Sequence, residues 1–210
     1  MDEKKVEERD VKIILLGEPG VGKTSIINRY INNQFSSITQ STYGSSFTVK
    51  EVMKNNVKYF INVWDTSGQE KYHSVTNLFI NGSNVVILVY AINSKPSFEG
   101  LDYWYSTIKE KLEGDSFILS IVGSKGDLIE NEVITEEQGK KYADKKNAIF
   151  KIVSAKENPE GINKLFDVLL DELIKNNKYE PRGESIAISK PSKTKKIKKV
   201  FADENYFNRQ

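Results

Sequence analysis

The sequence predicts an α/β fold with a six-stranded, mostly parallel sheet, one antiparallel edge strand, and helices on both faces. Two observations indicate this. Strand-like and helical patterns alternate over about 170 residues, as in proteins built from right-handed crossovers between parallel strands. Four of the strand-like runs are short and mainly apolar on both faces, which is typical of strands buried in a parallel sheet.

The six expected strands fall into two groups. The four apolar runs are residues 11–16, 85–92, 117–122 and 148–153. Residues 47–53 and 57–64 instead mix polar and apolar positions, and only residues 54–56, Lys-Asn-Asn, separate them. Two such runs joined so closely favour an antiparallel hairpin at an edge of the sheet.

Four helices are expected between these strands. The first runs from the stretch at residues 17–24 to about residue 32, and the second runs from after Pro96 to about residue 113. The third begins at Thr135, where the sequence TEEQ forms a capping box. The fourth has apolar residues at helical spacing, which we expect to pack on the sheet. These residues are Ile162, Leu165, Phe166, Leu169, Leu170, Leu173 and Ile174.

The composition narrows the possible functions. A chain of 210 residues suffices for one domain and a tail, and the absence of cysteine excludes disulfides, a cysteine nucleophile and thiolate metal sites. The 31 basic and 29 acidic residues nearly balance, which does not suggest a nucleic-acid binder. The charged start MDEKKVEERD has no signal-peptide core, and no apolar run has the length of a membrane span. We therefore expect a cytoplasmic protein.

The chain is expected to have three parts. Residues 1–10 form a charged N-terminal extension, residues 11–177 form the folded domain, and residues 178–210 form a flexible, lysine-rich tail. Six lysines lie between Lys190 and Lys199, and they could hold an anionic membrane surface. A solvated tail, or a sorting or nuclear-import-like signal, explains this run equally well.

The stretch GEPGVGKT at residues 17–24 matches the phosphate-binding P-loop, GxxxxGK[ST], and lies between a buried strand and a helix as that motif requires. Its glycines let backbone N–H groups cradle phosphate oxygens at the positive end of the helix dipole. Lys23 can bind the outer phosphates, and the Thr24 hydroxyl can ligate magnesium. Pro19 has no N–H to give but does not by itself prevent binding. The other loop residues assigned to the nucleotide are Glu18, Gly20, Val21, Gly22 and Ser25.

Three further motifs follow other strands toward the same rim of the sheet, where ligands of open α/β folds bind. In WDTSGQE, residues 64–70, Asp65 can hold magnesium through water and Gly68 can turn its N–H to a terminal phosphate. Gln69 can orient a hydrolytic water and is the candidate catalytic residue. The motifs GSKGD, residues 123–127, and SAK, residues 154–156, follow two later buried strands.

The ordered set GxxxxGKT, Thr42, DxxGQ, KxD and SAK resembles the small GTPases of the Ras superfamily over residues 10–176. The sequences TYGSSF, NVWDTSGQEKYHS, FINGS and ILVYAIN are similar to the Rab family, and KYHS and KKYAD lean toward its endocytic branch. The resemblance implies a P-loop NTPase fold of the small G-domain type over residues 11–177. It also implies slow hydrolysis of GTP to GDP and phosphate with Mg²⁺. The protein would be a monomer, cytoplasmic or peripheral on endomembranes, and would switch effector binding in vesicle or endosomal traffic.

The resemblance assigns roles around the guanine base. Asp127 would accept from the N1 and N2 hydrogens of guanine, a pairing that adenine cannot offer. Lys125 would lie over the base, Ala155 would give its N–H to O6, and Phe35 would stack edgewise. The remaining residues of these loops are Ser124, Ser154 and Lys156.

It also assigns the metal and the protein partners. Mg²⁺ would be held by Thr24, by Thr42 of switch I and, through water, by Asp65; Gly68 and Gln69 would belong to switch II. An exchange factor, a GAP and effectors would bind through the two switches. The GAP would supply the arginine that is not recognisable in this chain. The effector-facing aromatic trio is Phe47, Trp64 and Phe79, although core packing is the alternative reading of the last two.

The chain departs from the family pattern at Pro19, where the family often has a small residue, and in three further respects. Ser67 replaces the usual alanine of DTAG and could alter hydrolysis in either direction. Ser124 replaces the asparagine of NKxD, which would lose the reach of the amide to guanine N7 and the P-loop and weaken binding by about 0.5–1.5 kcal/mol. The sequence has no cysteine to prenylate, and Asp2 stands where myristoylation requires glycine.

These departures leave a second hypothesis open, a nucleotide-binding pseudo-switch scaffold with impaired hydrolysis. Such a scaffold would hold nucleotide permanently, or hardly bind it, and would work as an interaction module. A third hypothesis, a P-loop ATPase, is disfavoured by Asp127 and the SAK motif. His73, the only histidine, receives no catalytic role.

Overall fold

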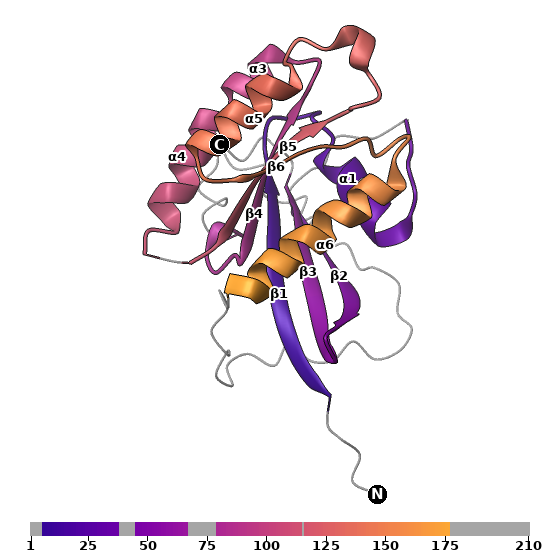
Figure 1. The fold of residues 1–210 in the computed structure, drawn as a ribbon, viewed down its shortest axis with the longest axis vertical. Coiled ribbons are helices and arrows are strands. Elements are labelled where there is room, and N and C mark those ends of the chain that lie inside the picture. Colours follow the sequence, from indigo (N-terminus) through magenta and orange to yellow (C-terminus); the bar gives the residue numbers. More distant parts are fainter. Residues whose placement is uncertain (1–5, 38–44, 67–78, 115, 177–210) are drawn as a thin grey trace, which may run out of the picture. The chain divides into compact units, whose positions relative to one another are not determined.

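The computed structural model describes residues 6–37, 45–66, 79–114 and 116–176. Contacts divide the chain into two units, Met1–Glu180 and Pro181–Gln210, and every described residue belongs to the first. Six strands form one sheet in the order β2-β3-β1-β4-β5-β6 (Figure 1). They are β1 (Glu7–Leu16), β2 (Ser45–Lys54), β3 (Val57–Thr66), β4 (Val85–Ala91), β5 (Ile118–Ser124) and β6 (Ile149–Ile152).

The predicted antiparallel edge strand is confirmed. β2 is antiparallel to β3, whereas the other neighbouring strands are parallel. The pairing extends to Lys54 opposite Val57, so the connection has two residues and not the three that the sequence suggested. Asn55 and Asn56 have φ angles of 51° and 62°. A two-residue hairpin turn of type I′ requires positive φ at both positions, and asparagine tolerates that conformation better than most residues.

β1 begins four residues earlier than the apolar pattern predicted. Residues Glu7–Asp10, which we had placed in the N-terminal extension, pair in parallel with Val57–Phe60 of β3. Their charged side chains are largely exposed, and β4 joins β1 only from Ile13 onward. Backbone pairing requires no apolar side chain, so the strand continues past the buried part of the sheet.

Helices cover both faces of the sheet (Figure 1). They are α1 (Lys23–Asn32), α3 (Lys95–Glu99), α4 (Leu101–Lys111), α5 (Glu136–Lys145) and α6 (Pro159–Asn176), with a short 3-10 helix, η2 (Ile129–Asn131). The two faces of β1 belong to different apolar cores: Ile13 and Leu15 pack with residues of α1 and α6, and Ile14 and Leu16 pack with residues of α4 and α5. This alternation is the period of two that a central strand imposes.

The apolar stripe of α6 packs on the sheet as predicted. Ile162, Leu165, Phe166, Leu169, Leu170 and Leu173 are buried, and Ile174 is half-buried. Each fully buried side chain of this size contributes roughly 1.5–3 kcal/mol relative to an exposed one. The Phe166 ring also stacks on Tyr30 of α1 with centroids 3.7 Å apart. The stripe therefore fixes α1, which carries the phosphate loop at its start, against the sheet.

The segment after Pro96 forms two helices and not the single one predicted. Gly100 separates α3 from α4, and a Cβ placed on Gly100 would lie 2.8 Å from the Glu18 carboxylate of the phosphate loop. The absence of a side chain on Gly100 therefore lets the helix junction lie close to that loop. The predicted capping box of α5 is present, since Gln138 N–H donates to the Thr135 hydroxyl and Thr135 N–H donates to the Gln138 side chain. Nowhere in the described ranges does a helix combine the length and apolar character needed to cross a bilayer.

Candidate functional site

The motifs predicted to bind one ligand follow the carboxyl ends of four strands. Gly17 follows β1, Asp65 lies near the end of β3, Ser124 ends β5 and Ser154 follows β6. β1, β3, β5 and β6 run parallel in one sheet, so these ends meet at one rim. The structure thus brings the phosphate loop and the later motifs to the same edge.

Two glycines shape the phosphate loop. A Cβ on Gly17 would lie 2.2 Å from the Val89 carbonyl oxygen of β4, so only glycine lets the chain leave β1 at this point. Gly22 caps α1 with φ 97°, and its carbonyl accepts from Ile26 N–H at 2.9 Å. Pro19 lies in the exposed part of the loop. The curl therefore presents the amino-terminal end of α1, where helix N–H groups and the dipole favour an anion.

Lys23 lies inside this curl with a side chain that is almost completely buried. Only 4% of the residue is exposed, and its Nζ donates to the carbonyls of Gly17 at 2.8 Å and Glu18 at 3.0 Å. Burying an ammonium group is costly without a compensating negative charge. A phosphate bound in the loop would place a negative charge beside this ammonium.

Thr24 and Asp65 meet at the adjoining position. The Thr24 hydroxyl donates to Asp65 Oδ2 at 2.7 Å, and Asp65 is 3% exposed. The next residue, Thr66, donates to the Leu15 carbonyl at 2.8 Å and so ties the end of β3 to β1. A hydroxyl and a carboxylate supply the hard oxygen donors that Mg²⁺ prefers. These two predicted metal residues therefore fit that ion.

Ser124 contacts the phosphate loop, which corrects the expectation that serine loses this reach. Its hydroxyl donates to the Val21 carbonyl of the loop and also lies 2.9 Å from the Tyr90 carbonyl of β4. Ser124 is 2% exposed, so the loop and β5 approach closely enough for a short hydroxyl to replace a longer amide. The expected loss of the contact with guanine N7 is a separate matter and stays a prediction.

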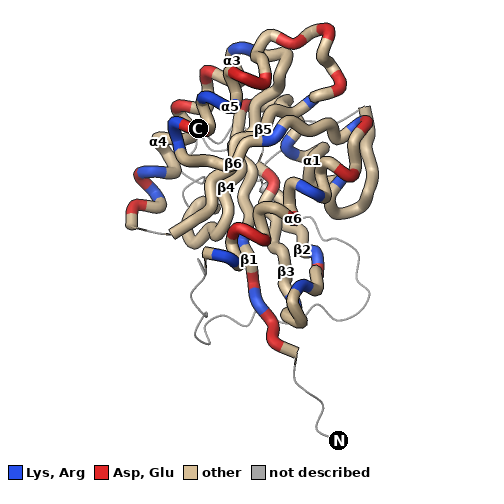
Figure 2. The backbone as a smooth tube through the Cα atoms, viewed as in Figure 1, with Lys and Arg blue, Asp and Glu red and all other residues tan. Residues whose placement is uncertain are grey.

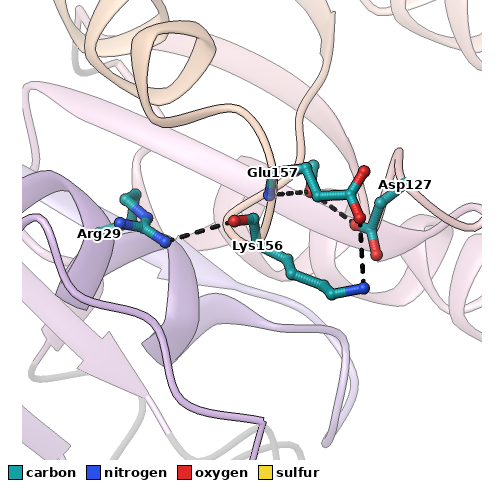
Figure 3. Close-up of polar contacts among 5 residues, drawn as sticks. Arg29, Asp127, Lys156 and Glu157 are labelled. Atoms are coloured by element: carbon teal, nitrogen blue, oxygen red, sulfur yellow. Dashed lines mark hydrogen bonds and ion pairs between the residues drawn. The ribbon is translucent and has the colours of Figure 1, made fainter.

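The two loops predicted to bind the base also contact each other (Figure 3). The Ser154 hydroxyl donates to Asp127 Oδ1 at 2.6 Å and accepts from Glu157 N–H at 3.0 Å. Gly126 N–H donates to the Val153 carbonyl at 3.0 Å, and Lys125 adopts φ 58°. Ser154 thus orients the carboxylate that was predicted to select guanine.

Arg29 is a residue of this region that the sequence reasoning missed. It lies on α1, yet its guanidinium donates to the carbonyl of Ala155 and to that of Lys156 (Figure 3). A basic residue in the last turn of a helix is a known favourable placement and gives no hint of a distant partner. The spatial proximity of α1 and the SAK loop, which the sequence does not reveal, creates this contact.

Two further predicted residues lie in or just after α1. Phe35 follows the end of α1 and is 37% exposed. Ser25 lies in the first turn of α1. Thr42, Gly68 and Gln69, like Ser67, His73 and the run Lys190–Lys199, lie outside the described residues.

The predicted aromatic trio lies in one contiguous row. The ring centroids of Phe47 and Trp64 are 5.1 Å apart, and those of Trp64 and Phe79 are 5.3 Å apart. Phe47 is 45% exposed, whereas Trp64 and Phe79 are half-buried and pack against the core beside α4. The last two rings therefore belong partly to the core and partly to the surface.

Charge is mixed over the described elements. Figure 2 shows Lys and Arg interspersed with Asp and Glu along the helices and strands. The preference for an anion at the rim therefore comes from Lys23 and the start of α1, and not from a broad basic surface.

Comparison with known proteins agrees with this geometry. The chain matches the Ras family over residues 12–175. It is 36% identical over 174 residues to the Ras-related protein Rab-17 of Homo sapiens, covering 83% of this chain and 81% of that protein. It is 38% identical over 177 residues to the Ras-related protein RabC of Dictyostelium discoideum, covering 82% and 89%. It is 37% identical over 171 residues to the putative ras-related protein Rab-5B of the same organism, covering 81% and 78%.

Proposed function

Because the chain belongs to the Ras family of small GTPases, and within it to the Rab family, we propose that it is a guanine-nucleotide switch. It binds GTP or GDP with Mg²⁺, hydrolyses GTP slowly, and binds effectors according to the nucleotide it holds.

The observation that carries the proposal is the orientation of Asp127 at the rim of the phosphate loop. Ser154 holds one oxygen of this carboxylate at 2.6 Å, and the hydroxyl of Ser124, three residues before Asp127, bonds to Val21 of the phosphate loop. A base bound at Asp127 and phosphates bound at Lys23 would therefore belong to one ligand. A carboxylate that accepts two hydrogens from the edge of a base favours guanine over adenine.

The residues divide the chemistry between them. Lys23 and the start of α1 bind the phosphates, and Thr24 and Asp65 hold the metal with Thr42. Mg²⁺ neutralises charge that develops on the phosphate oxygens. Gln69 orients the attacking water, and Thr42 and Gly68 hold the two switches against the γ-phosphate. Loss of that phosphate releases both switches.

Partner binding follows from this cycle. Phe47, Trp64 and Phe79 form a contiguous row, and we propose that effectors bind there. An exchange factor reloads the protein, and a GAP supplies an arginine to speed hydrolysis. The similarity to proteins named Ras-related Rab supports a role in vesicle or endosomal membrane traffic, peripheral on endomembranes. The lysines between Lys190 and Lys199 would attract anionic lipid.

The test is the nucleotide content and turnover of the purified protein. We expect bound GDP and slow loss of radiolabelled GTP, with faster nucleotide exchange when EDTA removes the metal. A preparation that binds no guanine nucleotide would contradict the proposal and support the scaffold hypothesis, which Ser67 and Ser124 motivate. Competition by ATP as effective as that by GTP would instead favour an ATPase.

The role of Gln69 has its own test. Gln69→Leu should bind GTP normally but hydrolyse it at least about tenfold more slowly, since a positioned water and its orienting group typically contribute 10²–10⁴-fold. Single-turnover hydrolysis of preloaded GTP measures this directly. A Gln69→Leu protein that hydrolyses GTP at the unmodified rate would refute the assigned mechanism.

A further inference from the structure

Arg29 joins two segments that lie far apart in the sequence. From the last turn of α1, its Nε donates to the Ala155 carbonyl at 2.7 Å and its Nη2 to the Lys156 carbonyl at 3.4 Å. Its Nη1 donates to the Asn33 carbonyl at 2.8 Å and to Asn33 Oδ1 at 3.2 Å. The half-buried guanidinium therefore clamps the SAK loop to the carboxyl end of α1.

The partners of Arg29 show what the clamp does. Within the part of the chain that the structure describes, its guanidinium donates to three backbone carbonyls and one side-chain amide, and none of these acceptors is a carboxylate. A surface ion pair would tolerate many arrangements of two flexible side chains. The planar Arg29 guanidinium instead binds four acceptors at once. Because three of these are backbone carbonyls, it holds the backbone in place at those positions.

The contact to Ala155 completes the restraint of the SAK loop. The Ser154 carbonyl accepts from Asn158 N–H at 3.1 Å, which fixes the peptide plane before Ala155. The Arg29 bond to the Ala155 carbonyl fixes the peptide plane after it. Because each peptide unit is planar, these two bonds together set the backbone of Ala155 on both sides. Without Arg29, only the first of the two planes remains held.

The contact to Asn33 reaches the other side of the site. Asn33 ends α1 in the left-handed conformation, with φ 51°, and its N–H donates to the Arg29 carbonyl at 3.0 Å. Phe35 lies two residues further along. Arg29 thus links the SAK loop, whose Ser154 contacts Asp127, to the segment that leads from α1 to Phe35.

We propose that Arg29 is a positioning residue that holds the SAK loop in its base-binding conformation and so slows the release of guanine nucleotide. The inference rests on the proposed function. Arg29 acts through backbone carbonyls at the base end of the site, whereas the phosphate end is held by Lys23, Thr24 and Asp65. Its removal therefore changes nucleotide release without changing the hydrolysis of GTP that is already bound.

The experiment compares full-length Arg29→Gln, Arg29→Lys and unmodified protein. Release of fluorescent GDP is expected to be about 10- to 100-fold faster in Arg29→Gln, because hydrogen bonds from a charged donor are stronger than neutral ones. Arg29→Lys keeps the charge but lacks the fork, so we expect a smaller increase. Single-turnover hydrolysis of preloaded GTP should stay within about twofold of the unmodified rate in both variants, because Arg29 makes none of the transition-state contacts.

Arg9→Gln is the matched control, since Arg9 lies on β1 and pairs with Glu7 away from the rim. This control should release GDP at the unmodified rate. Equal acceleration in Arg9→Gln, or GDP release at the unmodified rate in both Arg29 variants, would overturn the inference. If Arg29→Gln does not fold, the release rate of Arg29→Lys decides. Failure of the unmodified protein to bind GDP would instead overturn the proposed function, so the two failures are distinguishable.

Discussion

Ser124 offers a sharp test of how the base loops support the phosphate loop. The substitution Ser124→Ala removes the hydroxyl that donates to the Val21 carbonyl and lies 2.9 Å from the Tyr90 carbonyl. A hydroxyl has one proton, so a single bond is lost, and a buried carbonyl acceptor is left without its donor. Such a loss costs about 1–3 kcal/mol. The contact links β5 to the phosphate loop, so this cost should affect nucleotide binding as well as stability.

Ser120→Ala provides a matched control on the same strand. Ser120 is completely buried, and its hydroxyl likewise donates to a backbone carbonyl, that of Ile149 at 3.0 Å. Ser120 lies four residues before Ser124 on β5 and is therefore further from the rim. At the rise of a β-strand, the two residues are roughly 13 Å apart. Both variants should lose stability to a similar extent, with thermal midpoints that fall by about 2–4 °C for each kcal/mol.

The two variants should differ in nucleotide release. Each 1.4 kcal/mol corresponds to about tenfold, so Ser124→Ala should release fluorescent GDP about 5- to 100-fold faster, while Ser120→Ala should release it at the unmodified rate. Ser124→Thr retains the hydroxyl and should stay close to the unmodified rate. Equal GDP release rates in Ser124→Ala and Ser120→Ala would refute the reasoning, because the hydroxyl would then stabilise the fold without supporting the phosphate loop.

Two further predictions concern the metal and the buried tyrosines. EDTA should accelerate GDP release from the unmodified protein. Asp65→Asn should release GDP about 10- to 100-fold faster even without EDTA and respond little to it, because indirect ligands typically contribute that much to metal affinity. An EDTA response in Asp65→Asn equal to that of the unmodified protein would contradict the role of Asp65. Burial raises the pKa of Tyr30 and of Tyr90 above the ordinary value, with Asp167 adding to the effect for Tyr30 and with Glu132 and Glu136 adding to it for Tyr90. Above about pH 10 the unfolded chain loses these protons and the native state keeps them, so stability should fall by about 1.4 kcal/mol per pH unit for each tyrosine. Tyr90→Phe should reduce the dependence of stability on pH, as measured by denaturant titrations at several alkaline pH values. An identical dependence in that variant would contradict the raised pKa of Tyr90.

Much of the fold could be predicted because its signals are local. Strands buried on both faces require continuous apolar runs, and the hairpin requires residues such as Asn55 and Asn56 that accept positive φ. The early start of β1 escaped prediction because its charged residues carry no apolar signal while their backbone still pairs with β3. The break at Gly100 escaped it because an isolated glycine inside a helical pattern does not by itself mark a boundary, and the nearness of Gly100 to Glu18 joins distant parts of the chain.

In the candidate site, too, local sequence signals could be predicted and contacts between distant parts of the chain could not. Lys23, Thr24 and Asp65 could be assigned because each motif has a fixed spacing after a strand, and parallel strands place those motifs at one rim. The contact of Ser124 with Val21 could not be assigned, because a sequence gives the length of a side chain but not the distance it must span. Arg29 was missed for a related reason, since its partners are backbone carbonyls that any residue type would present.

The central position of β1 in the sheet has a consequence for the order of folding. β2 and β3 meet across a two-residue turn, but β1 pairs Glu7 with Val57 and Ile13 with Val85, so its contacts must close long loops of chain. Pairings of such high contact order form slowly and late. The phosphate loop begins where β1 ends and takes its shape only when β1 has joined both neighbours. A nucleotide bound in that loop would therefore act on the finished sheet, and we expect it to slow unfolding and to leave the rate of folding nearly unchanged.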